Sequence, residues 1–167
     1  MRRYKHLVNF GALIGSEANG VVQRKADLLN GMAFTWELGE QDISNIKYAL
    51  TTLVRLGKAA GSTTAWLPTK PGIELILSDS NINSFIKSFD NYPLRMKDLY
   101  IGTAHPQGGN LCSAQQAIRV TDEKGRVEGY ENVFVADASL FPTSLTVNPQ
   151  WTIMAMSGMV AKGVVGV

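Results

Sequence analysis

The sequence predicts an α+β fold in which a mostly antiparallel sheet packs against a few helices. Residues 42–60 place apolar side chains at helical spacing, whereas residues 32–38 alternate between apolar and polar as a strand does. Several further short apolar runs are separated by glycine and proline turns. Charged residues make up 18% of the chain and apolar residues 45%, so we expect a packed core rather than disorder.

Two helices are expected in the first hundred residues. The longer covers 42–60, with Asp42 as N-cap and Gly61 just past its end. Its inward stripe comprises Ile43, Ile46, Leu50, Leu53, Val54 and Gly57. The shorter helix covers 81–89 and follows Ser80, which is a typical N-cap residue.

The expected strands are short. Residues 32–38 form one whose apolar face lines a core or a cavity, and 63–77 are interrupted by prolines and contain loop and strand. Residues 117–121 and 132–136 are two further strands on either side of a turn that ends at Gly125. The apolar face of the first strand comprises Met32, Phe34, Trp36 and Leu38.

Composition argues against several classes of function. The formal net charge is +2 and the only tight basic cluster lies at the N-terminus, which we interpret as a solvated end rather than a nucleic-acid contact. Cys112 is the single cysteine, so an internal disulfide is impossible, and no Cys or His pairs have zinc-binding spacing. No apolar run has the length of a membrane span or the form of a signal peptide, so we expect a cytoplasmic protein.

Three polar features of the last third suggest one assembled site. His105 lies in a glycine-rich loop and is suited to general base catalysis near neutral pH. Asp137 ends an apolar run, where it can cap the following turn or bind a ligand hydroxyl. Asn148 precedes Pro149, which opens a helix; its amide can cap that helix or act on a ligand beside the free N–H groups.

The order and spacing of these features resemble the C-terminal segment of the glucose–methanol–choline (GMC) family of flavin oxidoreductases. The His-Pro-x-Gly-Gly spelling looks most like the cholesterol-oxidase branch, and the match covers about residues 100 to 165. The residues on which this resemblance depends are His105-Pro106, Gly108-Gly109, Gly125-Arg126-Val127, Gly129, Asn132 to Ser139, Pro142, Asn148-Pro149 and Thr152.

The resemblance implies a role for each matching residue. His105 would take the hydroxyl proton of an alcohol while hydride moves to FAD, and Asn148 would polarise the substrate oxygen. Asp137 and Ala138 would lie along the ribityl-pyrophosphate chain of FAD. The residues at the helix tip that would approach the flavin pyrimidine edge are Pro149, Gln150 and Thr152.

The chain lacks the dinucleotide-binding unit with which family members begin. Gly11, Gly15 and Gly20 do not have Gly-x-Gly-x-x-Gly spacing. We therefore expect a C-terminal part of a longer enzyme, with residues 1–100 on the substrate side and 101–167 as the catalytic and flavin-contacting segment. The final strand and helix would then belong to the FAD domain of the intact enzyme. This chain alone would lack FAD and activity until the N-terminal FAD-binding region is supplied.

The sequence leaves a non-catalytic alternative open. An interaction module could keep the motif as a scaffold and present Trp36, Trp66 and Trp151 as a binding patch. The apolar residues of the last helix also predict self-association. Cys112 is either a packed small residue or an accessible thiol.

Overall fold

Each half of the chain is built from two separate stretches of sequence. The structure is a computed structural model that describes residues 4–25 and 31–166. One unit comprises the described parts of residues 1–14 and 38–101, and the second comprises those of 15–37 and 102–167. Helices and antiparallel strand pairs occur together, which confirms the predicted α+β class.

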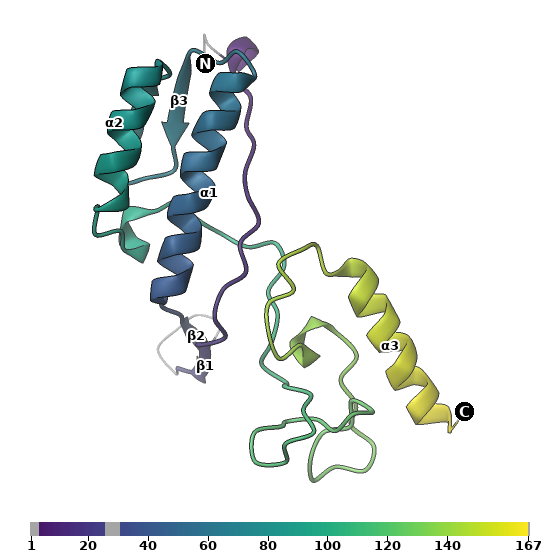
Figure 1. Ribbon diagram of the computed structural model, residues 1–167. Coiled ribbons are helices and arrows are strands. Elements are labelled where there is room, and N and C mark those ends of the chain that lie inside the picture. Colours follow the sequence, from purple (N-terminus) through teal and green to yellow (C-terminus); the bar gives the residue numbers. More distant parts are fainter. Residues whose placement is uncertain (1–3, 26–30, 167) are drawn as a thin grey trace. The chain divides into compact units, whose positions relative to one another are not determined.

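Unit 1 packs two helices against one β-hairpin. The helices are α1 (Glu40–Ala59) and α2 (Asp79–Asp90). The hairpin joins β3 (Thr64–Leu67) to β4 (Ile73–Ile76), with Thr64 opposite Ile76. α1 and α2 contact each other, and each also contacts one strand of the hairpin (Figure 1). Both predicted helices are thus present, and the predicted loop-and-strand region contains the hairpin.

The core of unit 1 consists of apolar side chains from both helices, the hairpin and the loop after α2. Phe89 is 3% exposed and stacks on Phe85, with 5.0 Å between the ring centroids. Burial of each such side chain contributes roughly 1.5–3 kcal/mol to folding. The full set is Ile46, Leu50, Val54, Leu67, Leu77, Ile82, Phe85, Phe89, Leu94 and Leu99.

The helix ends differ from prediction by about half a turn. Asp42 is not the N-cap of α1; it occupies the first turn and its carboxylate accepts the Gly39 N–H at 3.1 Å. α2 begins at Asp79 and its N-cap is Ser78 rather than Ser80, since the Ser78 hydroxyl accepts the Asn81 N–H at 3.2 Å. Gly61 follows α1 as predicted, with a φ of +86° that glycine adopts at little cost.

Unit 2 has less regular structure. It contains the antiparallel pair β1 (Val21–Arg24) and β2 (Met32–Thr35), with Val21 opposite Thr35. It also contains α3 (Gln150–Val165) and the 3₁₀ helix Ala138–Leu140. Proline therefore precedes the last helix as predicted, in the N-cap position.

Two predicted strands of unit 2 are reduced to isolated bridges. Residues 117–121 contribute only Thr121, which pairs with Val127, and 132–136 contribute only Phe134, which pairs with Arg126. The turn at Gly125 and the bend at Gly129 follow each other so closely that no longer paired run fits between them. Both glycines have the positive φ expected of such turns, +74° and +79°.

The apolar face of β2 is not part of a core. The exposed fraction is 63% for Met32 and 83% for Phe34, while Trp36 and Leu38 lie beyond the end of the strand and are half-buried. The prediction that this face lines a core is wrong for Met32 and Phe34. The alternative, that this face lines a cavity, stays a prediction.

Candidate functional site

A glycine-rich loop lies directly against the turn that follows Asp137. Three backbone N–H groups of the loop, those of Gly108, Asn110 and Cys112, donate to successive carbonyls of the turn at 3.1, 3.0 and 3.1 Å. The acceptors are the carbonyl oxygens of Ala138, Ser139 and Leu140. Leu140 is fully buried, so the turn that accepts these three bonds is itself anchored by packing.

Two glycines allow the loop to take this course. Gly108 and Gly109 have φ values of +82° and +111°, which side-chain-bearing residues rarely adopt. The backbone conformation at these two positions therefore explains why the motif has glycine at both. It turns the chain immediately after His105-Pro106-Gln107.

Asp137 caps the 3₁₀ turn, which is one of the two roles predicted for it. Its Oδ1 accepts both the hydroxyl and the backbone N–H of Ser139, the latter at 2.8 Å. The Ser139 hydroxyl, and secondarily its N–H, hold the pKa of this carboxyl below its usual value. The side chain is exposed and ionised at neutral pH, so capping leaves it accessible to a ligand.

Asn148 does not cap α3. Pro149 occupies the N-cap position and makes no side-chain cap, and no side chain of the described residues accepts a bond from the first turn. The first intrahelical bond runs from the Ile153 N–H to the Pro149 carbonyl at 2.8 Å, so the N–H groups of residues 150–152 precede it. Pro149 is buried, whereas Asn148, Gln150 and Thr152 are exposed. The helix thus presents unused donors and a partial positive charge beside an exposed carboxamide.

His105 is half-buried, and its backbone N–H donates to the Thr103 hydroxyl at 2.9 Å. Two residues later, the side-chain oxygen of Gln107 accepts the Leu145 N–H at 3.1 Å. This bond ties the loop carrying His105 to the segment that leads into Asn148. Within residues 4–25 and 31–166, no hydrogen bond joins His105 itself to Asn148.

α3 is fastened to the segment just before Asp137. The Ser157 hydroxyl donates to the Ala136 carbonyl, and the buried Val160 packs over Gly125. The Val135 N–H in turn donates to the Gly125 carbonyl at 2.8 Å. These contacts, made by the middle and second half of α3, connect that helix to the Asp137 turn and, through the turn, to the glycine-rich loop.

Three residues that tether these segments were not predicted from the sequence, namely Gln107, Asn110 and Ser139. The Asn110 side-chain N–H donates to the Ser139 hydroxyl at 2.8 Å. The contact of Ser139 could have been found, because an aspartate side chain commonly accepts the backbone N–H two residues on. Gln107 and Asn110 bond to residues 38 and 29 positions away, for which the sequence carries no local signal.

Cys112 is packed rather than freely accessible. Its thiol is half-buried and contacts the Asp122 carbonyl oxygen at 3.2 Å. This supports the interpretation of a small packed residue. No group of three or more His, Cys, Asp or Glu side chains in the described part of the chain could hold a metal ion.

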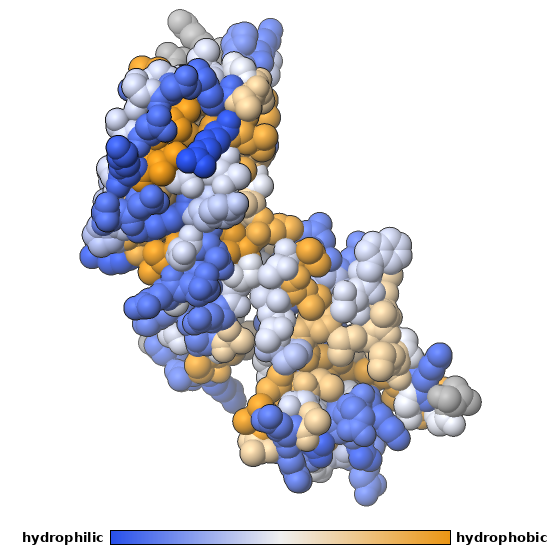
Figure 2. Space-filling view, in the orientation of Figure 1, coloured by the Kyte–Doolittle hydropathy of each residue, from blue (hydrophilic) through white to orange (hydrophobic). Residues whose placement is uncertain are grey.

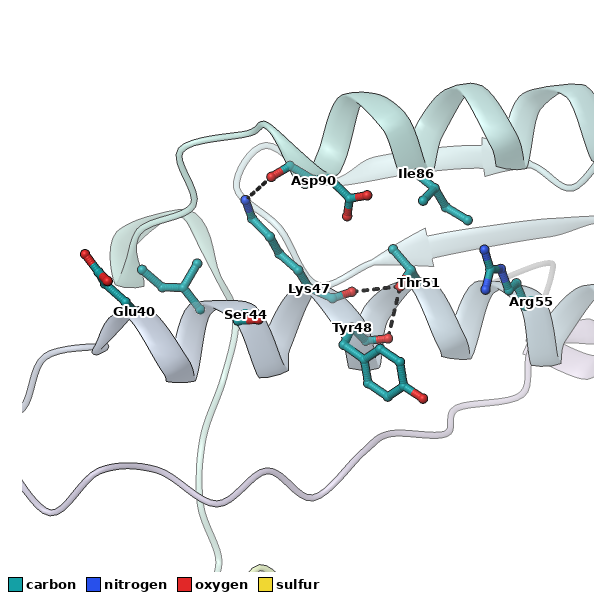
Figure 3. Close-up of a pocket in the computed structure, with 9 residues that line it drawn as sticks. Glu40, Ser44, Lys47, Tyr48, Thr51, Arg55, Ile86 and Asp90 are labelled. Atoms are coloured by element: carbon teal, nitrogen blue, oxygen red, sulfur yellow. Dashed lines mark hydrogen bonds between the residues drawn. The ribbon is translucent and has the colours of Figure 1, made fainter.

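A surface groove of about 530 Å³ lies elsewhere, between α1 and α2 of unit 1. Its lining includes the apolar Ile43 and Ile86. The charged Lys47, Arg55 and Asp90 also line it (Figure 3). Figure 2 shows apolar surface between these two helices, framed by hydrophilic side chains. None of the predicted site residues lines this groove. No helix in the described ranges is both long and apolar enough to cross a lipid bilayer.

Comparison with known proteins decides the family. A family model described as GMC oxidoreductase matches residues 18–157. The chain belongs to the GMC oxidoreductase family. The matched range includes the His105 loop, the Asp137 turn and the start of α3, so the connected unit described above is a GMC element.

Individual relatives agree with this assignment. A GMC-type oxidoreductase of Mycobacterium tuberculosis, itself uncharacterised, is 28% identical over 159 residues, which cover 95% of this chain and 24% of the relative. A second uncharacterised GMC-type oxidoreductase, from Sinorhizobium fredii, is 31% identical over 134 residues, or 80% of this chain and 26% of the relative. A long-chain-alcohol oxidase of Arabidopsis thaliana is 26% identical over 173 residues, covering 100% of this chain and 23% of the relative. The GMC chain thus spans about a quarter of the length of these relatives.

Proposed function

We propose that this GMC chain is the C-terminal part of an FAD-dependent oxidoreductase that oxidises the CH–OH group of an alcohol. The observation that carries the proposal is the uncapped start of α3, whose free N–H groups lie beside the exposed carboxamide of Asn148. The loop of His105 is tied to the same segment through Gln107 and Leu145. A site of this kind combines a base, a polarising amide and a helix terminus.

The residues present fit FAD. GMC oxidoreductases generally bind this cofactor. The uncapped N–H groups of residues 150–152 suit an electron-rich ring edge, which would be held by Pro149, Gln150 and Thr152. The exposed Asp137 carboxylate and the adjacent Ala138 backbone suit the hydroxyl-bearing ribityl chain. Bound there, FAD would supply the acceptor for the hydride that leaves the alcohol carbon.

Two side chains handle the substrate. His105 accepts the hydroxyl proton on its imidazole, and Asn148 hydrogen-bonds to the substrate oxygen and orients it. The product is the corresponding carbonyl compound. Asn148 is available for this role because capping does not engage its amide.

We further propose that the alcohol is long and apolar. The exposed face of Met32 and Phe34 offers apolar surface that core packing does not use, and the half-buried Trp36 follows it in the same unit. The long-chain-alcohol oxidase among the relatives and the His-Pro-x-Gly-Gly spelling shared with the cholesterol-oxidase branch both support such a substrate. Residues 1–100 would serve the substrate side and 101–167 the chemistry.

The proposal includes a partner for α3. Trp151, Met154 and Met159 are 83%, 55% and 64% exposed, which is unusual for large apolar side chains on one helix. An N-terminal FAD-binding region of the same protein would cover them. In the absence of that region, self-association of the chain would cover the same side chains.

The test joins this chain to the FAD-binding region of the Mycobacterium relative and measures alcohol-dependent flavin bleaching. We expect long-chain alcohols to bleach the flavin. His105→Ala and Asn148→Ala should each lower kcat by roughly 10²–10⁴-fold, the usual contribution of a positioned acid or base. Gln116→Ala, an exposed amide of the same unit, is the matched control.

Full activity in His105→Ala would refute the assignment of the base. A joined protein that binds FAD and yet bleaches with no alcohol would instead favour the non-catalytic interaction module. The chain alone should retain no yellow colour after FAD is added and the free FAD is removed, because a large part of the cofactor site is then missing.

A further inference from the structure

We propose that Asn110 is a positioning residue that acts on Asp137 through the Ser139 hydroxyl. The inference rests on the proposed function, which places Asp137 beside the ribityl chain of FAD. It goes further by naming the side chains that fix which carboxylate oxygen receives the cofactor.

The direction of the hydrogen bonds defines the relay. A serine hydroxyl has one proton, and that of Ser139 is given to Oδ1 of Asp137. The lone pairs of the same hydroxyl accept the Asn110 side-chain N–H at 2.8 Å. Hydrogen bonds in such a chain polarise one another, so the Asn110 amide strengthens the bond that Ser139 donates.

The relay leaves one carboxylate oxygen unused. Oδ1 of Asp137 accepts both the hydroxyl and the N–H of Ser139. Oδ2 has no hydrogen-bond partner among the described residues. The carboxylate is therefore held by one oxygen and presents the other to solvent, ready for a hydroxyl donor. A polyol such as the ribityl chain is a ligand of that chemistry.

Asn110 is held in place at two points. Its backbone N–H donates to the Ser139 carbonyl at 3.0 Å while its side chain donates to the Ser139 hydroxyl. The neighbouring bonds from Gly108 and Cys112 fix the loop on both sides. Capping of the 3₁₀ turn requires only Asp137 and Ser139, so turn formation does not account for the Asn110 amide.

The first test follows the carboxyl carbon of Asp137 by NMR in this chain without FAD, as the pH is lowered. Loss of the Ser139 hydroxyl removes a donor that stabilises the charged form, so Ser139→Ala should raise the titration midpoint. Asn110→Ala should raise it less, and the double variant should match Ser139→Ala, because both changes break the same chain of bonds. Ser139→Thr keeps a hydroxyl and should restore the native midpoint.

The second test measures FAD affinity in the chain joined to an FAD-binding region. We expect the Kd to rise about tenfold in Ser139→Ala and about threefold in Asn110→Ala, as for loss of a hydrogen bond that orients a charged group. Ser139→Thr and the Gln116→Ala control should stay within about twofold of the native Kd.

The two tests fail differently. An Asn110→Ala variant with native Asp137 titration would overturn the relay, whatever the FAD result. A native Kd in Asn110→Ala, with FAD binding intact in the unmodified protein, would overturn its role toward the cofactor. Absence of FAD binding in the unmodified joined protein would instead count against the proposed function, while the titration would still decide the relay.

Discussion

Replacement of Gly125 by alanine should weaken unit 2 far more than the same change at Gly129. Both glycines have a left-handed φ, +74° and +79°, so each alanine would be strained by its backbone alone. Their surroundings differ. A Cβ at position 125 would lie 2.6 Å from the Val135 carbonyl oxygen and 2.7 Å from a methyl of Val160, whereas one at 129 would meet nothing within 4 Å.

The difference between the two variants isolates the cost of that contact. The backbone strain is about 1–2 kcal/mol at either site. Crowding against a backbone oxygen and a buried side chain adds about 1–3 kcal/mol at position 125 only. We therefore expect Gly129→Ala to lower the free energy of unfolding by about 1–2 kcal/mol and Gly125→Ala to lower it by about 2–5 kcal/mol.

Urea denaturation followed by tryptophan fluorescence gives this difference. Trp66 belongs to unit 1 and would mix the two signals, so the measurement uses a Trp66→Phe background in which Trp36 and Trp151 report on unit 2. Equal losses in the two variants would refute the close packing of α3 on the Gly125 turn. That result would also remove one of the contacts that connect α3 to the Asp137 segment.

Three further predictions follow from burial and charge. Phe89→Ala should cost about 3–5 kcal/mol in urea denaturation, while Phe34→Ala, at an 83% exposed position, should change stability by less than about 0.5 kcal/mol. Burial alone would raise the pKa of Asp122. The backbone N–H groups of Arg126 and Lys124 and the Arg126 charge lower the pKa by more than burial raises it, so the pKa lies below its usual 3.8. Its stabilisation is therefore present above that pH and is lost as pH falls through the lower folded pKa; Asp122→Asn should flatten the acid limb of a stability–pH curve, and an unchanged limb would contradict the assignment. Trp151→Ser should reduce self-association of the chain in sedimentation velocity, with Trp66→Ser as the comparison, and equal effects of the two would argue against α3 as the contact.

The helices of unit 1 could be predicted because their signal is local. Ile46, Leu50 and Val54 recur at helical spacing, and the same side chains are buried in the structure. The helix ends were less accurate, since Asp42 and Ser80 are typical cap residues that lie one or two positions inside the helices. Several polar residues near a helix start can satisfy a first-turn N–H, and the choice depends on backbone angles that the sequence does not specify.

In unit 2, β2 falls within the strand predicted over 32–38. The predicted strands 117–121 and 132–136 are reduced to single bridges, which could not be predicted because pairing depends on partners distant in sequence. Val133 to Val135 have strand-like side chains, but only Phe134 forms a bridge. The same limit applies to the site. The motif predicted which segments would matter, whereas the bonds from Asn110 to Ser139 and from Leu145 to Gln107 emerged only from the fold.

The interleaved order of the two units has a consequence for biosynthesis. β1 and β2 are translated well before the rest of their unit, which begins at Gly102. At ribosomal rates of about 5–20 residues per second, that hairpin waits several seconds for the strand-poor region on which its unit depends. During this interval the hairpin has no neighbour from the rest of its unit, and an isolated two-stranded hairpin is only marginally stable in water, so we expect β1 and β2 to pair lastingly only after the later stretch has been synthesised.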